Sequence, residues 1–196
     1  MILSNSAILT ALDDGRLVIR PEPYPRSPSE DPAGGVCPYS TSAVDLRLGN
    51  EISWLNDDLP MAIDLRRGRF AKLFGPNSDR RRITEDQPFR LNPRKFVLAN
   101  TLERVELPIL PDCSSLAARV EGKSSYARCG LLVHFTAPVV HAGFAGHITL
   151  EIINLGPAPI DLFPEMYICQ LVFEEVTGTP IRNDSQFQGQ TQPHGA

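Results

Sequence analysis

Side chains suited to anion binding lie together in the third quarter of the chain. The run Gly122-Lys123-Ser124-Ser125 is a turn that offers a cation, two hydroxyl groups and accessible backbone N–H groups. This combination suits a phosphate or another anion. The run lacks the Walker A spacing, so it is not a P-loop and is by itself a weak indication. Arg128 follows Ser124 by four residues, and the two converge on one ligand if this segment coils.

Glu151 is the acid–base candidate. Alternation along a strand over residues 147–153 places Glu151 and Thr149 on the face opposite Leu150. A carboxylate among β-branched residues is costly to bury without a partner. Either this face is open to solvent, or Glu151 is held in a pocket that tunes its protonation. The residues alone leave both alternatives open.

The elements that must position these residues are mostly short strands. After a proline-rich loop over 21–38, Val44, Leu46 and Leu48 alternate with more polar residues, as in a half-buried strand. Prolines, glycines and asparagines separate further runs of this kind at short intervals, which predicts an all-β barrel or sandwich. The further strands are expected at 94–100, 116–120, 131–136, 147–153 and 167–174.

A short helix is expected at the N-terminus, capped by Ser4 or Ser6 and ended by Gly15. The basic segment 66–82 is interpreted as a solvated loop in preference to a phosphate or partner contact. The polar tail after Val176 contains Phe187 among glutamines, which is unusual for a linker.

Composition limits the class of protein. The 196 residues fit one domain, and 42% hydrophobic residues can form an ordinary core. The net charge of −4 points to neither nucleic acid nor an acidic membrane surface as a partner. We expect no signal peptide and no run of about 20 apolar residues that spans a bilayer. The four cysteines lack a C-x-x-C pair, which favours free thiols in a reducing cytoplasm over disulfides or zinc.

Several blocks, in a fixed order, carry a family resemblance. They cover nearly the whole chain and resemble the signature of dCTP deaminases. The blocks are Ile2-Leu-Ser4 to Leu17, Ser42-Ala-Val-Asp-Leu-Arg-Leu-Gly49, Asn92-Pro-Arg-Lys-Phe-Val-Leu-Ala99, Lys123-Ser-Ser-Tyr-Ala-Arg-Cys-Gly-Leu131, His134-Phe-Thr-Ala137, Gly143-Phe-Ala-Gly-His-Ile-Thr-Leu-Glu151, Pro164-Glu-Met-Tyr-Ile-Cys-Gln-Leu171 and Phe187-Gln-Gly-Gln190.

The resemblance implies a fold, an assembly and a reaction. The fold is a distorted β-barrel of the dUTPase-like type with a short N-terminal helix, covering residues 1–176, and residues 177–196 form a tail that closes over the nucleotide. Members are homotrimers with active sites between subunits. They deaminate dCTP to dUTP and ammonia without a catalytic metal, with Mg²⁺ bound through the phosphates. The chain has no H-x-E followed by P-C-x-x-C, the signature of zinc deaminases.

Carried over position by position, the resemblance makes Glu151 the general base and acid that activates water at cytosine C4. Ser124 and Ala137 would help to hold the water, and Arg128 would lie near Glu151. Lys123 and Ser125 match a phosphate-binding turn. His134 is expected to be a satisfied core histidine, and Phe144 to pack beside the sugar. The other substrate-contact positions are His141, Thr149, Gln170 and Gln190.

Departures from the family pattern leave three alternatives for function. His141 stands where the family has an aspartate that accepts a hydrogen bond from the sugar, and Gln186-Phe187 replaces a Lys-Tyr pair before the tail glutamine. The segment between Val176 and Gln190 is also short for the family. The expected function is deamination of dCTP to dUTP. The alternatives are a bifunctional enzyme that gives dUMP, which His141 disfavours, and a catalytically silent nucleotide-binding trimer.

Overall fold

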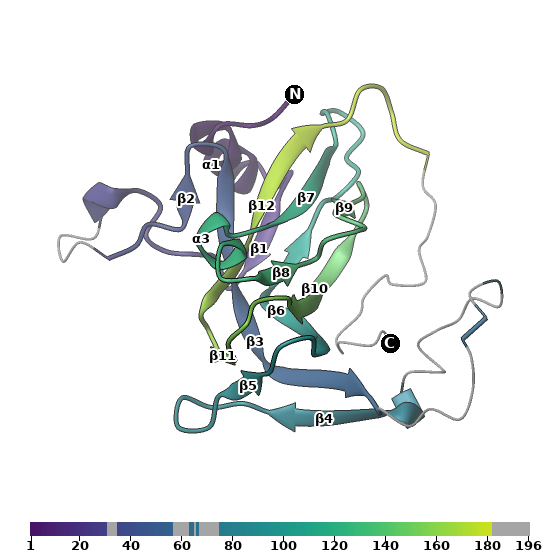
Figure 1. Ribbon diagram of the computed structural model, residues 1–196. Helices are drawn as coiled ribbons and strands as arrows, with labels where there is room; N and C mark the ends of the chain where they lie inside the picture. The colour runs from purple at the N-terminus through teal and green to yellow at the C-terminus, as the bar shows by residue number, and fades with distance from the viewer. Residues whose placement is uncertain (31–34, 57–62, 65, 67–74, 182–196) are drawn as a thin grey trace.

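Strands form most of the regular secondary structure, as the alternating sequence predicts. The computed structural model describes residues 1–30, 35–56, 63–64, 66 and 75–181 (Figure 1). In this part of the chain, ten strands form one curled, half-barrel sheet, with the order β8-β10-β6-β3-β12-β7-β9 and with β1, β2 and β4 attached at its sides. The strands are β1 (Val18–Arg20), β2 (Tyr39–Ser40), β3 (Ala43–Leu55), β4 (Ser78–Arg82), β6 (Phe96–Glu106), β7 (Leu116–Gly122), β8 (Leu131–Val133), β9 (Val139–Val140), β10 (Ala145–Asn154) and β12 (Tyr167–Glu175).

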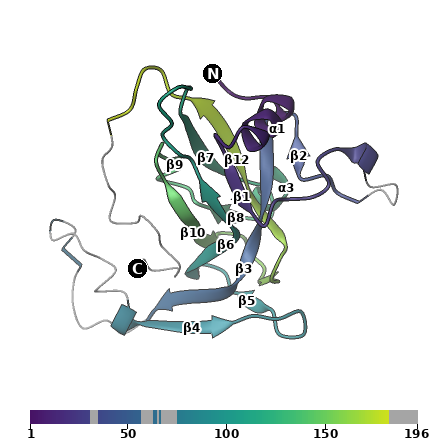
Figure 2. The ribbon, with the colours of Figure 1, turned by 180° about the vertical axis from the view of Figure 1, so that it is seen from behind.

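Strand β3 joins the two parts of the sheet because it is long enough to pair on both. Its first half pairs with β2 and β12, and its second half pairs with β4 and β6. The register shifts between Leu48 and Ile52, where β3 passes from one set of partners to the other. Figure 2 shows β3 running from the upper part of the sheet down to the ribbon that it forms with β4. A separate pair, β5 (Phe89–Leu91) with β11 (Ile160–Leu162), completes the strands.

The core lies on one face of each alternating strand. Along β10 every second residue is buried, including Leu150 and Ile152, and β6 buries Val97, Ala99 and Val105 in the same way. The residues between them are partly exposed, so one face of this layer carries side chains available for chemistry. Glu151 lies on this second face, as its spacing predicts.

The N-terminal helix follows the expected capping pattern. Helix α1 (Asn5–Asp13) begins after Ser4, whose Oγ accepts a hydrogen bond from the N–H of Ala7 at 3.3 Å. Its buried residues are Ile8 and Ala11. Gly15 ends the helical segment with φ of 73°, a conformation that favours glycine. No helix of the described residues is long and apolar enough to cross a membrane.

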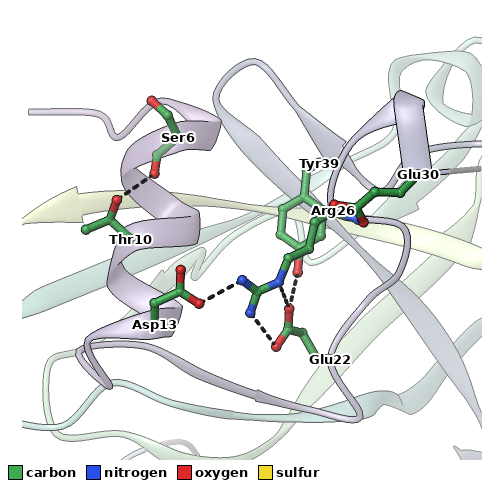
Figure 3. A network of polar contacts seen from close by, with 7 residues as sticks. All are labelled: Ser6, Thr10, Asp13, Glu22, Arg26, Glu30 and Tyr39. Carbon is green, nitrogen blue, oxygen red and sulfur yellow. Dashed lines mark hydrogen bonds and ion pairs between the residues drawn. The ribbon is translucent and has the colours of Figure 1, made fainter.

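An ionic network holds the proline-rich segment against α1 (Figure 3). The guanidinium of Arg26 donates to Glu22 at 2.6 and 3.1 Å and to Asp13 of α1 at 2.7 Å. These hydrogen bonds raise the pKa of Arg26, so its charge persists at every accessible pH. The Tyr39 hydroxyl donates to Glu22 at 3.5 Å, and burial raises the pKa of that phenol. The segment is irregular apart from the 3₁₀ turn η1 (Pro28–Glu30), as its prolines predict.

The basic segment is only partly the solvated loop that we expected. Residues 78–82 form strand β4, paired in antiparallel register with β3, and a 3₁₀ turn η3 (Gly75–Asn77) precedes it. Arg80, Arg81 and Arg82 are nonetheless exposed, so the expectation of solvated charges is confirmed for them. A run of arginines gives no hydrophobic alternation, which is why the strand escaped prediction. Residues 67–74 lie outside the described residues.

Candidate active site

Pairing of β8 with β10 brings His134 to Glu151. The register places Val133 opposite Ile152, and the chain continues so that the His134 N–H donates to the Glu151 carbonyl at 2.7 Å. The His134 side chain then lies 2.8 Å from the carboxylate, Nδ1 to Oε2, and its Nε2 lies 2.8 Å from the Ala137 carbonyl. His134 adopts this orientation with a positive φ of 52°. Strand pairing therefore produces a carboxylate–imidazole pair from residues 17 positions apart.

The two partners of the His134 ring favour its charged form. One ring nitrogen faces a carboxylate and the other a carbonyl, and only the doubly protonated imidazolium donates to both. Burial by itself lowers the pKa of His134, but the hydrogen bond and charge of Glu151, together with contacts to the backbone of Ala137 and Thr149, outweigh burial and raise it. The side chains of His134 and Glu151 are 10% and 35% exposed, so solvent reaches the carboxylate.

This geometry corrects the expectation for His134. Its Nε2 has a hydrogen-bond partner, but its Nδ1 lies at ion-pair distance from Glu151 without the geometry of a hydrogen bond, so the ring is only partly satisfied. Its Nδ1 faces the carboxylate of Glu151, which the family resemblance makes the general base. The carbonyl of Ala137, whose backbone is expected to help hold the water, accepts a hydrogen bond from this ring.

The hydroxyl-rich turn forms one short helix, α3 (Ser124–Ala127), between β7 and β8. The side chains of Ser124, Ser125 and Arg128 are exposed, and none of them has a polar partner among the described residues. Arg128 forms no ion pair with Glu151 in the part of the chain that the structure describes, so the expected contact between these two residues is absent within one chain. The turn and the Glu151–His134 pair are separate groups of one subunit.

Lys123, expected to contact phosphate, is already paired. Its ammonium forms an ion pair with Asp45 of β3 and lies 5.9 Å from the centre of the Tyr167 ring. The side chains of Lys123 and Asp45 are 20% and 10% exposed. Because Lys123 directly precedes α3, this pair holds the start of the turn against β3.

Replacing Asp45 by asparagine is expected to lower the free energy of unfolding by roughly 2–3 kcal/mol, because it leaves the Lys123 charge largely buried without its partner. The loss is smaller than for a fully buried pair because water still reaches Lys123. Urea unfolding at pH 7 measures it. Asp161→Asn is the matched control, since Asp161 pairs with the exposed Arg90 at 2.8 Å. Equal losses in the two variants would contradict a stabilising role specific to the Asp45–Lys123 pair.

Two further predicted positions, Thr149 and His141, lie on β10 and in the turn before it. Thr149 Oγ1 donates to Asn100 Oδ1 at 3.2 Å, which adds Asn100 of β6 to the Glu151 face, a residue that the sequence did not single out. His141 is exposed and begins the turn to Phe144, whose N–H donates to the His141 carbonyl at 3.1 Å.

The other two predicted contacts are Gln170 and Gln190. Gln170 lies on β12 beside Asp45 of β3 and Glu121 of β7. Gln190 lies outside the described residues, as does most of the predicted C-terminal tail. Among the described residues, no group of three or more His, Cys, Asp and Glu side chains is placed to hold a metal ion.

The fold and these groups define an all-β protein with a half-barrel sheet, a solvent-accessible carboxylate–histidine pair and a hydroxyl-rich turn. Comparison with known sequences identifies the family. Residues 2–176 match the profile of the family described as dCTP deaminase-like. The chain therefore belongs to the dCTP deaminase-like family.

Relatives support this assignment over nearly the full length. The dUMP-forming dCTP deaminase of Methanosphaera stadtmanae is 36% identical over 98% of this chain and 91% of its own. The dUMP-forming dCTP deaminase of Dictyoglomus thermophilum is 39% identical over 90% of this chain and 81% of its own. The dCTP deaminase of Natronomonas pharaonis is 38% identical over 100% of this chain and 94% of its own.

A solved structure confirms the fold. The 2′-deoxycytidine 5′-triphosphate deaminase of Agrobacterium tumefaciens superposes on 88% of this chain with a TM-score of 0.62 at 18% sequence identity. The chain spans 47% of the length of that protein. At this identity the similarity establishes the architecture alone, and it agrees with the predicted all-β class.

Proposed function

We propose that the protein deaminates dCTP hydrolytically and also hydrolyses the bond between the α- and β-phosphates, so that it releases ammonia, dUMP and diphosphate. Family membership over residues 2–176 supports the substrate, and the dUMP-forming names of the M. stadtmanae and D. thermophilum relatives support the product. The single observation that carries the chemistry is the Glu151–His134 pair at 2.8 Å on a solvent-accessible face. This product differs from the dUTP that we expected from the sequence.

Glu151 is the proposed proton carrier. The His134 ring contacts Oε2 of Glu151, which leaves Oε1 of the same carboxylate to accept a proton from a water molecule. That water attacks C4 of cytosine, and the carboxyl then delivers the proton to N3. Collapse of the tetrahedral intermediate breaks the bond from C4 to the amino nitrogen, which leaves as ammonia after proton transfer, so that a carbonyl stands at C4. The imidazolium of His134 orients the carboxylate and stays close to neutralise its charge.

The α3 turn is the proposed phosphate-binding element. The side chains of Ser124, Ser125 and Arg128 are exposed and have no polar partner among the described residues, so they are available to bind an anion. Lys123 would contribute its charge while it stays paired with Asp45. Mg²⁺ enters as part of the substrate, bound by the triphosphate oxygens.

A homotrimer with sites between subunits is part of the same proposal. The turn and the Glu151–His134 pair do not meet within one chain, so a second subunit would supply the missing group. Apolar side chains near both groups support a subunit contact: Phe135, Val139 and Leu155 are 46%, 48% and 59% exposed. Sedimentation equilibrium is expected to give three times the mass of the chain, and a monomeric mass would contradict the shared site.

The test of the product is incubation of the purified protein with dCTP and Mg²⁺, with ion-exchange separation of the nucleotides. Accumulation of dUMP with diphosphate supports the proposal. Accumulation of dUTP alone contradicts the second hydrolytic step while keeping the deamination. Recovery of unchanged dCTP, with binding seen by titration calorimetry, would indicate a silent nucleotide-binding protein.

His141 favours a second candidate, a deaminase that stops at dUTP. The family aspartate is negatively charged, whereas a neutral histidine accepts one hydrogen bond without that charge. If the native chain accumulates dUTP, His141→Asp is expected to raise the ratio of dUMP to dUTP by about 10-fold, since a gain of roughly one charged hydrogen bond is worth a factor of this size. An unchanged ratio would show that residue 141 does not decide the product.

A further inference from the structure

The strand that carries Glu151 ends in a close backbone contact with the segment that carries Arg128. After β10, the N–H of Leu155 donates to the Gly130 carbonyl at 2.8 Å. Gly130 and Gly156 then face each other without side chains. A Cβ on Gly130 would lie 2.2 Å from the Gly156 nitrogen, and a Cβ on Gly156 would lie 2.2 Å from the Cys129 carbonyl oxygen. Only glycine at both positions allows this approach.

The two glycines are constrained in different ways. Gly130 has a φ of 91°, so it needs glycine for its conformation as well as for space. Gly156 has no such conformation, so space alone excludes a side chain there. The atom that a side chain at 156 would meet is backbone, which cannot rotate away as a flexible side chain does.

Asn154 fixes the loop that presents Gly156. Its side chain is fully buried at the end of β10, and all of its polar groups are used. Oδ1 accepts from the Gly156 N–H at 2.9 Å, and Nδ2 donates to the carbonyls of Leu91 at 3.0 Å and Ala158 at 2.8 Å. A buried amide satisfied in this way holds three backbone segments in one arrangement.

This contact links the two groups of the candidate site. Glu151 precedes Asn154 by three residues on β10, and Arg128 precedes Gly130 by two. We propose that Gly156 and Asn154 are positioning residues for the reaction: they fix the turn with Ser124 and Arg128 against the end of the strand with Glu151, and so set how the turn of one subunit meets Glu151 of the next in the proposed trimer. The inference rests on the proposed function, and neither residue is assigned to touch the substrate.

The test compares Gly156→Ala with Gly15→Ala. In Gly156→Ala the new methyl group pushes the backbone at 129–130 away from β10, and we expect the turnover number for dCTP to fall by about 10²-fold, the effect of a misplacement near 1 Å. KM is expected to change much less. Gly15→Ala is the matched control because alanine is strained there by a φ of 73° but meets no atom within 4 Å. It should lose stability and keep its turnover number.

Amide hydrogen exchange gives a readout that does not depend on activity. In wild type, the N–H groups of Arg128, Cys129, Gly130 and Leu155 all donate to backbone carbonyls. In Gly156→Ala these amides are expected to exchange about 10-fold faster or more, while the central amides of β12 stay protected. Asn154→Ala, which loosens the same loop without a clash, should show the same pattern and serves if Gly156→Ala fails to fold.

The outcomes separate the two proposals. Wild-type protein that does not deaminate dCTP overturns the proposed function. Amide hydrogen exchange then still tests the backbone contact between Gly130 and Gly156. Gly156→Ala and Asn154→Ala with the turnover number and exchange pattern of Gly15→Ala overturn the positioning role. A rise in KM at an unchanged turnover number also overturns it.

Discussion

Replacing Glu151 by glutamine is expected to lower the turnover number for dCTP by about 10³–10⁴-fold, the upper part of the range for a general acid–base group. The amide keeps the size of the side chain but neither accepts the proton of water nor delivers it to N3. Ammonia release under saturating dCTP measures the change. Because the carboxylate is 35% exposed, its loss is not expected to disturb folding.

The control for Glu151→Gln is Glu174→Gln, a strand glutamate that pairs with Arg119 at 2.9 Å on another part of the sheet. This variant should turn over dCTP like wild type. Titration calorimetry should show that Glu151→Gln binds dCTP within a few-fold of wild type. Retained turnover in Glu151→Gln would exclude the mechanism, and lost binding would assign Glu151 to substrate recognition.

Replacing His134 by asparagine is expected to lower the turnover number by about 10²-fold at pH 6. An amide donates a hydrogen bond to Glu151 but carries no charge. The effect depends on pH because the pKa of His134 is raised. The charged imidazolium is present below that pKa and is lost as pH rises through it, so the ratio of wild-type to variant activity should narrow between pH 6 and pH 9.

The free energy of unfolding depends on pH with the same sign as the activity. A group whose pKa is raised on folding stabilises the native state fully below its unfolded pKa, and this contribution is lost as pH rises through the folded pKa. Wild type should therefore exceed His134→Asn in free energy of unfolding at pH 5–6 and lose part of this advantage at alkaline pH. His147→Asn, which alters the histidine of β10, is the control. A difference between wild type and His134→Asn that does not vary with pH would contradict the charged pair.

Much of the fold was predictable because runs rich in apolar residues coincide with β6, β10 and β12, although β6 continues past the expected 94–100 to Glu106, where it buries the polar Thr101 and Glu103. The short strands β1, β5, β9 and β11 have two or three residues, too few to show a period. Local geometry also decided where some strands end. The strand expected over 131–136 stops at Val133 because His134 takes a positive φ.

The candidate site was predictable in its residues but not in its contacts. Glu151 and the Lys123–Arg128 turn stood out by residue type and by family resemblance. The contact between His134 and Glu151 depends on the register of β8 against β10, and that between Lys123 and Asp45 joins residues 78 positions apart. The sequence did contain one signal for the position of His134. Two strand patterns close in sequence predict antiparallel neighbours, so a residue just after the first strand lies opposite a residue of the second strand.

The most direct test of the central claim is the initial rate of ammonia release from dCTP by wild-type protein and by Glu151→Gln in the same preparation. The account predicts stoichiometric ammonia with loss of dCTP for wild type, and a rate lower by about 10³-fold or more for the variant. Ammonia at equal rates from both proteins would contradict the role of Glu151. Absence of ammonia from wild-type protein that is folded and binds dCTP would contradict the deaminase function itself.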